Sequence, residues 1–129
     1  MNQHWNDYVK TCYDLVLESE QLTNEILQHD VEAYIVHLMA NNFEKTNIGQ
    51  EAIAIKMLSA TQKGRAQDFL NIGDECLLIH SFPLKQRSWP TPEYYCAMGT
   101  VAYGMAHHVM EQHFESAGRV LHEILRRIK

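Results

Sequence analysis

The chain has 129 residues, a net charge of -5, 46% hydrophobic residues and 21% charged residues. This length and composition are typical of one globular domain with a continuous core, and they exclude intrinsic disorder as the default state. No apolar run approaches the roughly 20 residues that a membrane span needs. The first ten residues lack the basic and apolar segments of a secretory signal, so we expect a cytoplasmic protein with no membrane partner.

Charge is unevenly distributed along the chain. Residues 1–30 carry six acids and one lysine, whereas the last twelve residues carry four cations and one acid. The two ends can attract each other within a subunit or between subunits, and cations also suit the C-terminal end of a helix, where carbonyl groups carry partial negative charge. Four cations on an acidic protein do not make a nucleic-acid surface, so no nucleic-acid partner is expected.

The first predicted element is a helix over residues 5–26. A 3.6-residue period indicates helices along the whole chain, and no tract has the alternation of a strand. In this first helix the apolar positions are spaced alternately by three and four residues, which makes a heptad seam about 30 Å long. The seam consists of Trp5, Tyr8, Cys12, Leu15, Ser19, Leu22 and Ile26, with Val9 and Val16 beside it. It can serve the protein's own core or a second copy, in which case Trp5, Tyr8 and Leu15 bind the partner.

Further helices are expected over residues 31–39, around residues 48–58 and over residues 66–80. Three prolines then interrupt the helical pattern between residues 81 and 93. Inside this segment, Trp89 and two nearby cations predict either a partner-binding patch or a tryptophan folded back over the core.

The sequence Thr91-Pro92-Glu93 supplies an N-cap, a proline at the first helical position and an acid in the first turn, so it predicts a helix start. The following helix, residues 94–106, is almost uncharged and rich in small residues. It is therefore expected at the centre of the bundle.

The last helix has its own apolar register, which begins at Met110 and is about 200° out of phase with the preceding helix. This mismatch predicts a short joint near His107, His108 and Val109. His107 and His108 each pair only with Glu111 at helical ligand spacing, and His113 adds no third ligand on the same face. Exposed joint histidines are the favoured interpretation. Metal binding is the alternative, and no metal or other cofactor is predicted.

A second candidate site lies on the predicted fourth helix. Gly73 and His80 share one face two turns apart, Asp74 flanks Gly73, and Tyr94 and Tyr95 open the helix after the proline-rich segment. Together these residues predict a small polar ligand pocket, with a metal or haem as a conceivable occupant. The alternative is a core histidine whose ring is hydrogen-bonded to a tyrosine or a backbone carbonyl.

Three stretches, "EAYIVHLM" (residues 32–39), "IGDECLLIHSFP" (residues 72–83) and "YYCAMGTVAYGMA" (residues 94–106), resemble a family of small helical bacterial proteins. That family combines a Gly-Asp helix, a Phe-Pro turn and a helix with Tyr-Tyr, Met-Gly and Ala-Tyr pairs. The resemblance covers about half of the chain and implies a bacterial, all-helical protein. The family has no known activity, so the resemblance only directs attention to matching residues, which are Gly73, Asp74, Phe82, Pro83, Tyr94, Tyr95, Gly99 and Tyr103.

The sequence as a whole predicts an all-α, single-domain bundle of five or six helices over residues 1–129. The leading functional hypothesis is a non-enzymatic interaction or regulatory protein that acts as a homodimer. The second is a ligand-, metal- or haem-binding bundle with its pocket around His80. The third is a small hydrolytic or lyase-type enzyme that uses His80 and Asp74 as an acid/base pair.

Overall fold

The computed structural model describes residues 3–42, 52–82 and 91–127, with residues 3–5 described by their backbone only. These residues form six α-helices and one 3-10 helix: α1 (Gln3–Thr23), α2 (His29–Asn42), α3 (Ile53–Lys63), α4 (Ala66–Ser81), α5 (Pro92–Met105), η1 (Val109–Gln112) and α6 (Phe114–Arg127). This described part contains no strand, so the predicted all-α bundle is confirmed. None of these helices is long and apolar enough to cross a membrane. The first residues of the helix predicted around 48–58 lie outside the described residues.

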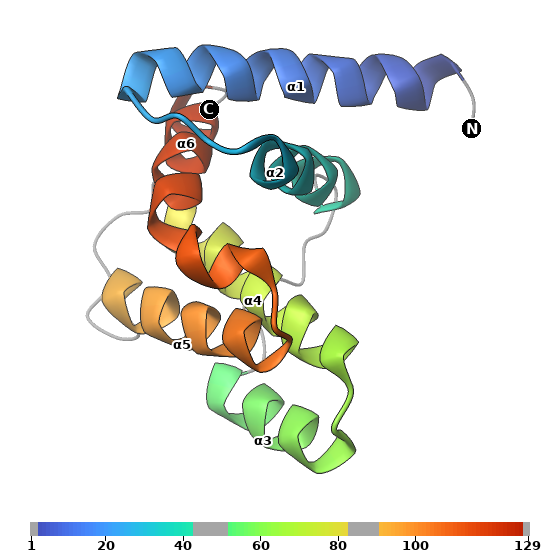
Figure 1. Cartoon of the computed structure of the whole chain (residues 1–129), viewed down its shortest axis with the longest axis vertical. Helices are drawn as coiled ribbons and strands as arrows, with labels where there is room; N and C mark the ends of the chain where they lie inside the picture. The colour runs from blue at the N-terminus through green and yellow to red at the C-terminus, as the bar shows by residue number, and fades with distance from the viewer. Residues whose placement is uncertain (1–2, 43–51, 83–90, 128–129) are drawn as a thin grey trace.

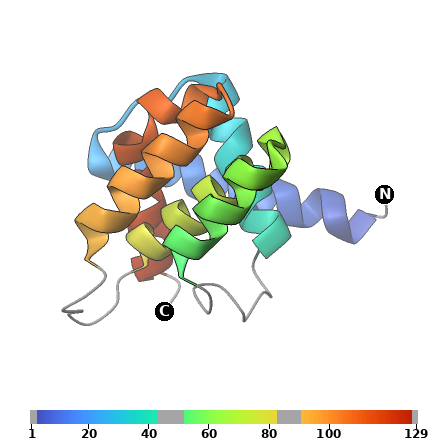
Figure 2. The same cartoon turned by 90° about the horizontal axis from the view of Figure 1, so that it is seen from below.

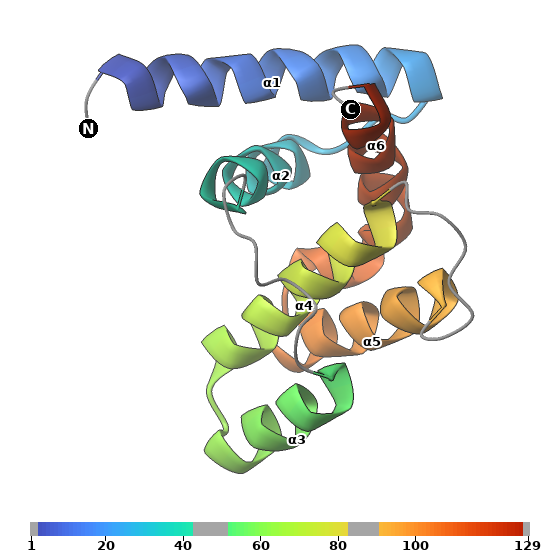
Figure 3. The same cartoon turned by 180° about the vertical axis from the view of Figure 1, so that it is seen from behind.

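α4 runs through the middle of the molecule and packs against three other helices (Figures 1 and 3). α5 lies along one side of α4, α6 crosses its C-terminal end, and α3 contacts it from another side. α6 leads from α4 to α1, which lies across one end of the molecule and also contacts α2. The N-terminal half of α1 extends past the rest of the bundle (Figures 1 and 2).

The centre of the bundle is therefore α4, and not the helix over residues 94–106 as the sequence indicated. Seven residues of α4 are buried, whereas α5 buries only four. Val101 and Met105 on the outer face of α5 are each 51% exposed. The small residues of α5 explain the difference. They allow α5 to pack closely against α4 on one side, but they do not require other helices on the remaining sides.

Two glycines allow α4 and α5 to approach closely. A Cβ atom on Gly73 of α4 would lie 2.7 Å from Cε1 of Tyr103 in α5. A Cβ atom on Gly99 of α5 would lie 2.8 Å from Cβ of Cys76 in α4, and closer still to the ring of Phe114. Because real Cβ atoms do not approach other atoms this closely, each helix uses a glycine where the other helix places a side chain.

The heptad seam of α1 is only partly buried. Cys12, Val16 and Ser19 are at most 1% exposed and belong to the core, whereas Leu22 is 60% and Ile26 96% exposed. The predicted seam is wrong at this end because α1 is a straight helix with 3.6 residues per turn, so a 3.5-residue pattern drifts about 20° per heptad. α1 also ends at Thr23, before Ile26.

The opposite charges of the two chain ends meet within one subunit, where they join α1 and the loop after it to α6. Arg127 in α6 donates to Glu18 in α1 at 2.7 Å, and Arg119 in α6 pairs with Glu25. Both pairs are partly exposed, so each contributes at most about 1 kcal/mol. They orient α6 against the end of α1 more than they stabilise the fold.

The boundaries of α5 agree with the sequence. The Thr91 side chain accepts a hydrogen bond from Tyr94 N at 3.2 Å, and Pro92 occupies the first helical position. After α5 ends, His107 has a φ of +53°, a left-handed conformation that stops the helix. α6 begins seven residues later, so the predicted joint is confirmed.

Candidate functional site

The residues predicted to form a pocket around His80 are not brought together. His80 Nδ1 lies 2.9 Å from the Pro92 carbonyl oxygen, to which it must donate, and its ring packs 5.5 Å from that of Phe114. Asp74 hydrogen-bonds elsewhere and lines a different pocket. A pocket of about 440 Å³ does lie beside His80, but Thr23, Gly118, Arg119, His122 and Glu123 line it with His80. The predicted lining by Asp74 and the His80–Asp74 acid/base pair are therefore wrong, because positions 74 and 80 lie about 120° apart around a helix.

The other predicted ligand-binding residues have packing roles in the described structure. Gly73 is buried where Tyr103 crosses α4. The rings of Tyr94 and Tyr95 pack edge to face, 5.6 Å apart, at the start of α5, and Tyr95 is buried. The alternative interpretation of His80, a ring hydrogen-bonded to a backbone carbonyl, is the one that the structure shows.

Asp74 is the acceptor of two tyrosine hydroxyl groups from different helices. Tyr34 of α2 and Tyr103 of α5 both donate to Asp74 Oδ1, at 2.5 and 2.7 Å. Burial, reinforced by the Asp74 carboxylate, raises the pKa of both tyrosines well above the usual range. Both phenols therefore remain protonated donors at physiological pH. We call these three residues the Asp74 network; it connects α2, α4 and α5.

The joint between α5 and α6 covers the Asp74 network. The ring of His108 lies 4.6 Å from that of Tyr34 and 5.8 Å from that of Tyr103. His108 Nδ1 accepts a hydrogen bond from Met110 N at 3.2 Å, which caps η1 and holds the ring in place. Thus His108, predicted as an exposed joint residue, is half-buried and packs on the network.

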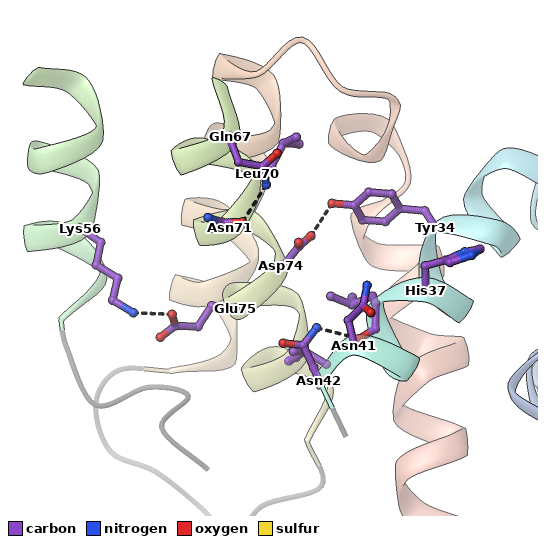
Figure 4. A pocket seen from close by; sticks show the side chains of 12 residues that line it. Tyr34, His37, Asn41, Asn42, Lys56, Gln67, Leu70, Asn71, Asp74 and Glu75 are labelled. Carbon is purple, nitrogen blue, oxygen red and sulfur yellow. Dashed lines mark hydrogen bonds and ion pairs between the residues drawn. The ribbon is translucent and has the colours of Figure 1, made fainter. Parts of the chain in front are cut away.

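A polar pocket of about 550 Å³ opens beside the Asp74 network (Figure 4). Side chains of α2, α3 and α4 line it, and they are Tyr34, His37, Leu38, Asn41, Asn42, Lys56, Gln67, Leu70, Asn71, Asp74, Glu75 and Leu78. Nine of these twelve residues have a polar group on the side chain, and the other three are leucines. A pocket of this size and lining suits a small polar molecule.

Hydrogen bonds fix the orientation of several groups in this pocket. Asn42 donates to the Leu38 carbonyl at 2.7 Å, which leaves its amide oxygen as an acceptor. Gln67 donates to the side-chain oxygen of Asn71 at 2.9 Å, so the Asn71 amide nitrogen remains a donor. The pocket therefore offers both acceptors and donors in defined positions.

Charged side chains contribute to the lining of this pocket. Lys56 of α3 forms an ion pair with Glu75 of α4 across one side of it (Figure 4). His37 Nδ1 lies 2.8 Å from the Ala33 carbonyl oxygen, to which it must donate. The Asp74 carboxylate, which accepts from two phenols, adds an acidic group to the lining, and such a group favours a donor-rich ligand.

The histidines of the joint do not form a metal centre with their neighbours. In residues 3–42, 52–82 and 91–127, no group of three or more His, Cys, Asp or Glu side chains is arranged to hold a metal ion. His107 is exposed and His113 is half-buried.

Two of the predicted partner-binding residues are tryptophans, Trp5 and Trp89. The side chain of Trp5 and all of Trp89 lie outside the described residues.

Sequence reasoning gave neither Tyr34 nor Tyr103 a functional role. Tyr34 was treated as an apolar position of its helix, and Tyr103, which is fully buried, was named only among the residues that match the resemblance. Their common feature is a phenol on a core-facing position, and a buried phenol requires an acceptor. Asp74 is a charged residue beside the buried Gly73 and could have been identified as that acceptor.

A second acidic cluster lies where α1 turns into α2. Glu20 is only 8% exposed; its Oε1 accepts from Leu27 N at 2.8 Å, while its Oε2 is buried and has no N–H donor among the described groups. Burial, together with the hydrogen bond to Glu20 and the negative charge of Glu20, raises the pKa of Glu32 to about 7. Glu32 therefore keeps its proton to a higher pH than an exposed glutamate does.

The raised pKa of Glu32 predicts a pH dependence of stability. Because the pKa of Glu32 is about 7 when folded and about 4.5 when exposed, the folded protein binds more protons between these values. The free energy of unfolding should therefore fall as the pH rises from 5 to 8, by roughly 1 to 2 kcal/mol after allowance for partial solvent exposure. Urea unfolding monitored by circular dichroism at several pH values measures it.

The variant Glu32→Gln provides the control for this prediction. It keeps a donor for Glu20 but cannot ionise, so it should remove most of the decrease between pH 5 and 8. Glu93→Gln, at an exposed position in the first turn of α5, should leave the decrease unchanged. An equal slope in wild type and Glu32→Gln would show that another group causes it.

Comparisons with known proteins provide no relative. No family model matches the sequence, and neither the curated proteins nor the solved structures include a match. The resemblance to small helical bacterial proteins therefore stays a prediction, and the function is argued from the site alone.

Proposed function

We propose that this protein is a non-enzymatic binding protein, which takes a small polar ligand into the pocket beside the Asp74 network. One observation supports the proposal most directly: a carboxylate held by two phenols from other helices lines a polar pocket of about 550 Å³. The ligand class follows from the Asp74 carboxylate in the lining and from the fixed amides. It is a small molecule with a protonated amine and further hydrogen-bonding groups.

Thermal-shift titration with ethanolamine, putrescine and L-lysine tests this function. A ligand at 100 times its Kd stabilises the folded state by about 2.7 kcal/mol, so at least one amine should raise Tm by several degrees. Asp74→Asn should abolish that increase. Asp14→Asn, which removes an exposed carboxylate of α1, should retain it. Equal shifts in both variants would reflect nonspecific binding of cations, and no shift with any amine would contradict the ligand class.

We also propose that the protein forms a homodimer through the N-terminal half of α1. This half extends past α2 and α6 (Figure 2), and Tyr8, Val9 and Leu15 are only partly buried within one subunit. Light scattering after size exclusion should give twice the 15.0 kDa monomer mass. Trp5→Glu should restore the monomer, and Ile55→Ser on the exposed face of α3 should not. A monomer at every concentration would exclude the dimer.

These two roles are compatible, and both place the protein in the class of interaction or regulatory proteins. A bacterial, cytoplasmic setting remains part of the proposal, and the sequence resemblance supports its bacterial part. An enzymatic role has lost its main support, because His80 and Asp74 do not meet.

A further inference from the structure

The end of α1 and the loop after it expose apolar residues around an acidic pocket. Leu17 is 47%, Leu22 60% and Ile26 96% exposed. The pocket has a volume of about 400 Å³ and is lined by Leu17, Glu20, Gln21, Asn24, Glu25, Ile26 and Glu32. We call these residues, with Leu22, the α1-end surface. Large apolar side chains exposed beside such a pocket are typical of an interaction surface.

Among the described residues, Arg119 pairs with one of the three glutamates of the α1-end surface, Glu25. Three glutamates line the pocket, and the described residues that line it include no cation. Arg119 of α6 reaches Glu25 from the side and also contacts Ser116. Glu20 and Glu32 both line the pocket, and Glu20 Oε2 is buried with no hydrogen-bond partner among the described groups. A cation in the pocket would lie beside both carboxyl groups and would favour the ionised form of Glu32.

We propose that the α1-end surface binds a protein segment that presents a lysine or arginine flanked by apolar side chains. The cation enters the pocket between Glu20 and Glu32, and the apolar neighbours cover Leu17 and Ile26. The glutamates of the pocket require a basic residue in the partner segment, because opposite charges attract. The exposed aliphatic side chains require apolar residues beside that basic residue. This surface is separate from the Asp74 pocket and from the N-terminal half of α1.

A second copy of the chain is not the occupant in a symmetric dimer. A two-fold axis through the surface would place Glu20 and Glu32 opposite the same residues of the other copy, and like charges in an interface are unfavourable. The partner must therefore offer a different, basic surface. A helix with leucines three and four residues from an arginine fits, because these positions share one face.

Isothermal titration calorimetry with a designed peptide tests the proposal. The probe is an alanine-rich helical peptide with one central arginine, a leucine four residues before it and a leucine three residues after it. Wild-type protein should bind it with a Kd in the micromolar range. At pH 6, binding should release up to one proton from Glu32, seen as a dependence of the heat on the buffer's ionisation enthalpy, and at pH 8 it should release almost none.

Variants at exposed or isosteric positions keep the protein folded during this test. Ile26→Ser should weaken binding about tenfold, and Glu32→Gln should remove the proton release. Ile55→Ser, a matched apolar substitution on α3 at a position that is 59% exposed, should do neither. A peptide with citrulline in place of arginine should not bind.

Three results would overturn the proposal. The first is no binding of the arginine peptide at millimolar concentration. The second is equal affinity of the Ile26→Ser and Ile55→Ser variants, which would place the peptide elsewhere. The third is Ca²⁺ binding that is lost in Glu32→Gln and competes with the peptide, which would assign the pocket to a metal ion.

Discussion

Replacing Asp74 by alanine is expected to lower the free energy of unfolding by about 2 to 4 kcal/mol. The carboxylate accepts from Tyr34 and Tyr103, and Tyr103 is fully buried. Without the acceptor, the Tyr103 hydroxyl stays inside the protein with an unmade hydrogen bond, which costs about 1 to 3 kcal/mol, and Tyr34 loses a charge-assisted bond. Chemical denaturation of wild type and variant measures the difference.

The two tyrosines provide a sharper form of this experiment. Tyr34→Phe and Tyr103→Phe each leave one phenol on Asp74 Oδ1, whereas the double variant leaves neither. The cost of the double variant should therefore exceed the sum of the single costs by about 0.5 to 1 kcal/mol. If the losses in the free energy of unfolding are additive, each phenol binds Asp74 independently of the other. The three residues would then not act cooperatively.

The second large effect is expected at the contact of α4 and α5. Gly99→Ala places a methyl group against Cβ of Cys76 and the ring of Phe114. Cys76 Cβ is fixed to its own helix, so α5 must move away from α4. Alanine gains up to about 1 kcal/mol of helix propensity, but overpacking costs more, and the net loss should be about 2 kcal/mol. Thermal unfolding should show a Tm lower by several degrees.

Gly104→Ala is the matched control on the same helix. Its Cβ atom would meet only the carboxylate of Glu111, which is exposed and can rotate away. This variant should be neutral or slightly more stable than wild type. Phe114→Leu should recover part of the Gly99→Ala loss when the two are combined. If Gly99→Ala and Gly104→Ala lower the free energy of unfolding equally, the loss would come from the α5 backbone itself. The contact of Gly99 with α4 would then not be its cause.

The fold was largely predictable because local signals determine where helices begin and end. The proline at position 92 and the change of apolar register before Met110 predicted the start of α5 and the joint before α6, and both are confirmed. The predictions were wrong for features that depend on how the helices pack against one another. The centre of the bundle and the exposure of Ile26 depend on crossing positions, which no local pattern shows.

The candidate site was less predictable for the same reason. Tyr34 and Asp74 are 40 residues apart in the sequence, and only the tertiary fold brings the Tyr34 hydroxyl of α2 to the Asp74 carboxylate of α4. His80 and Asp74 were grouped because they share a helix, but they point to different sides of it. Asp74 itself was among the predicted ligand-binding residues and lines the pocket, so this part of the hypothesis keeps its support.

α3 is attached to the bundle mainly through α4, and it buries only Ile53 and Ala60. A helix with so few buried side chains opens at a lower free-energy cost than the core, in a sub-global unfolding event. Because Lys56 of α3 lines the polar pocket, that opening removes one wall of it. A bound ligand that contacts Lys56 or Glu75 would favour the closed population, so amide exchange in α3 would slow on binding while exchange in α1 and α6 would not.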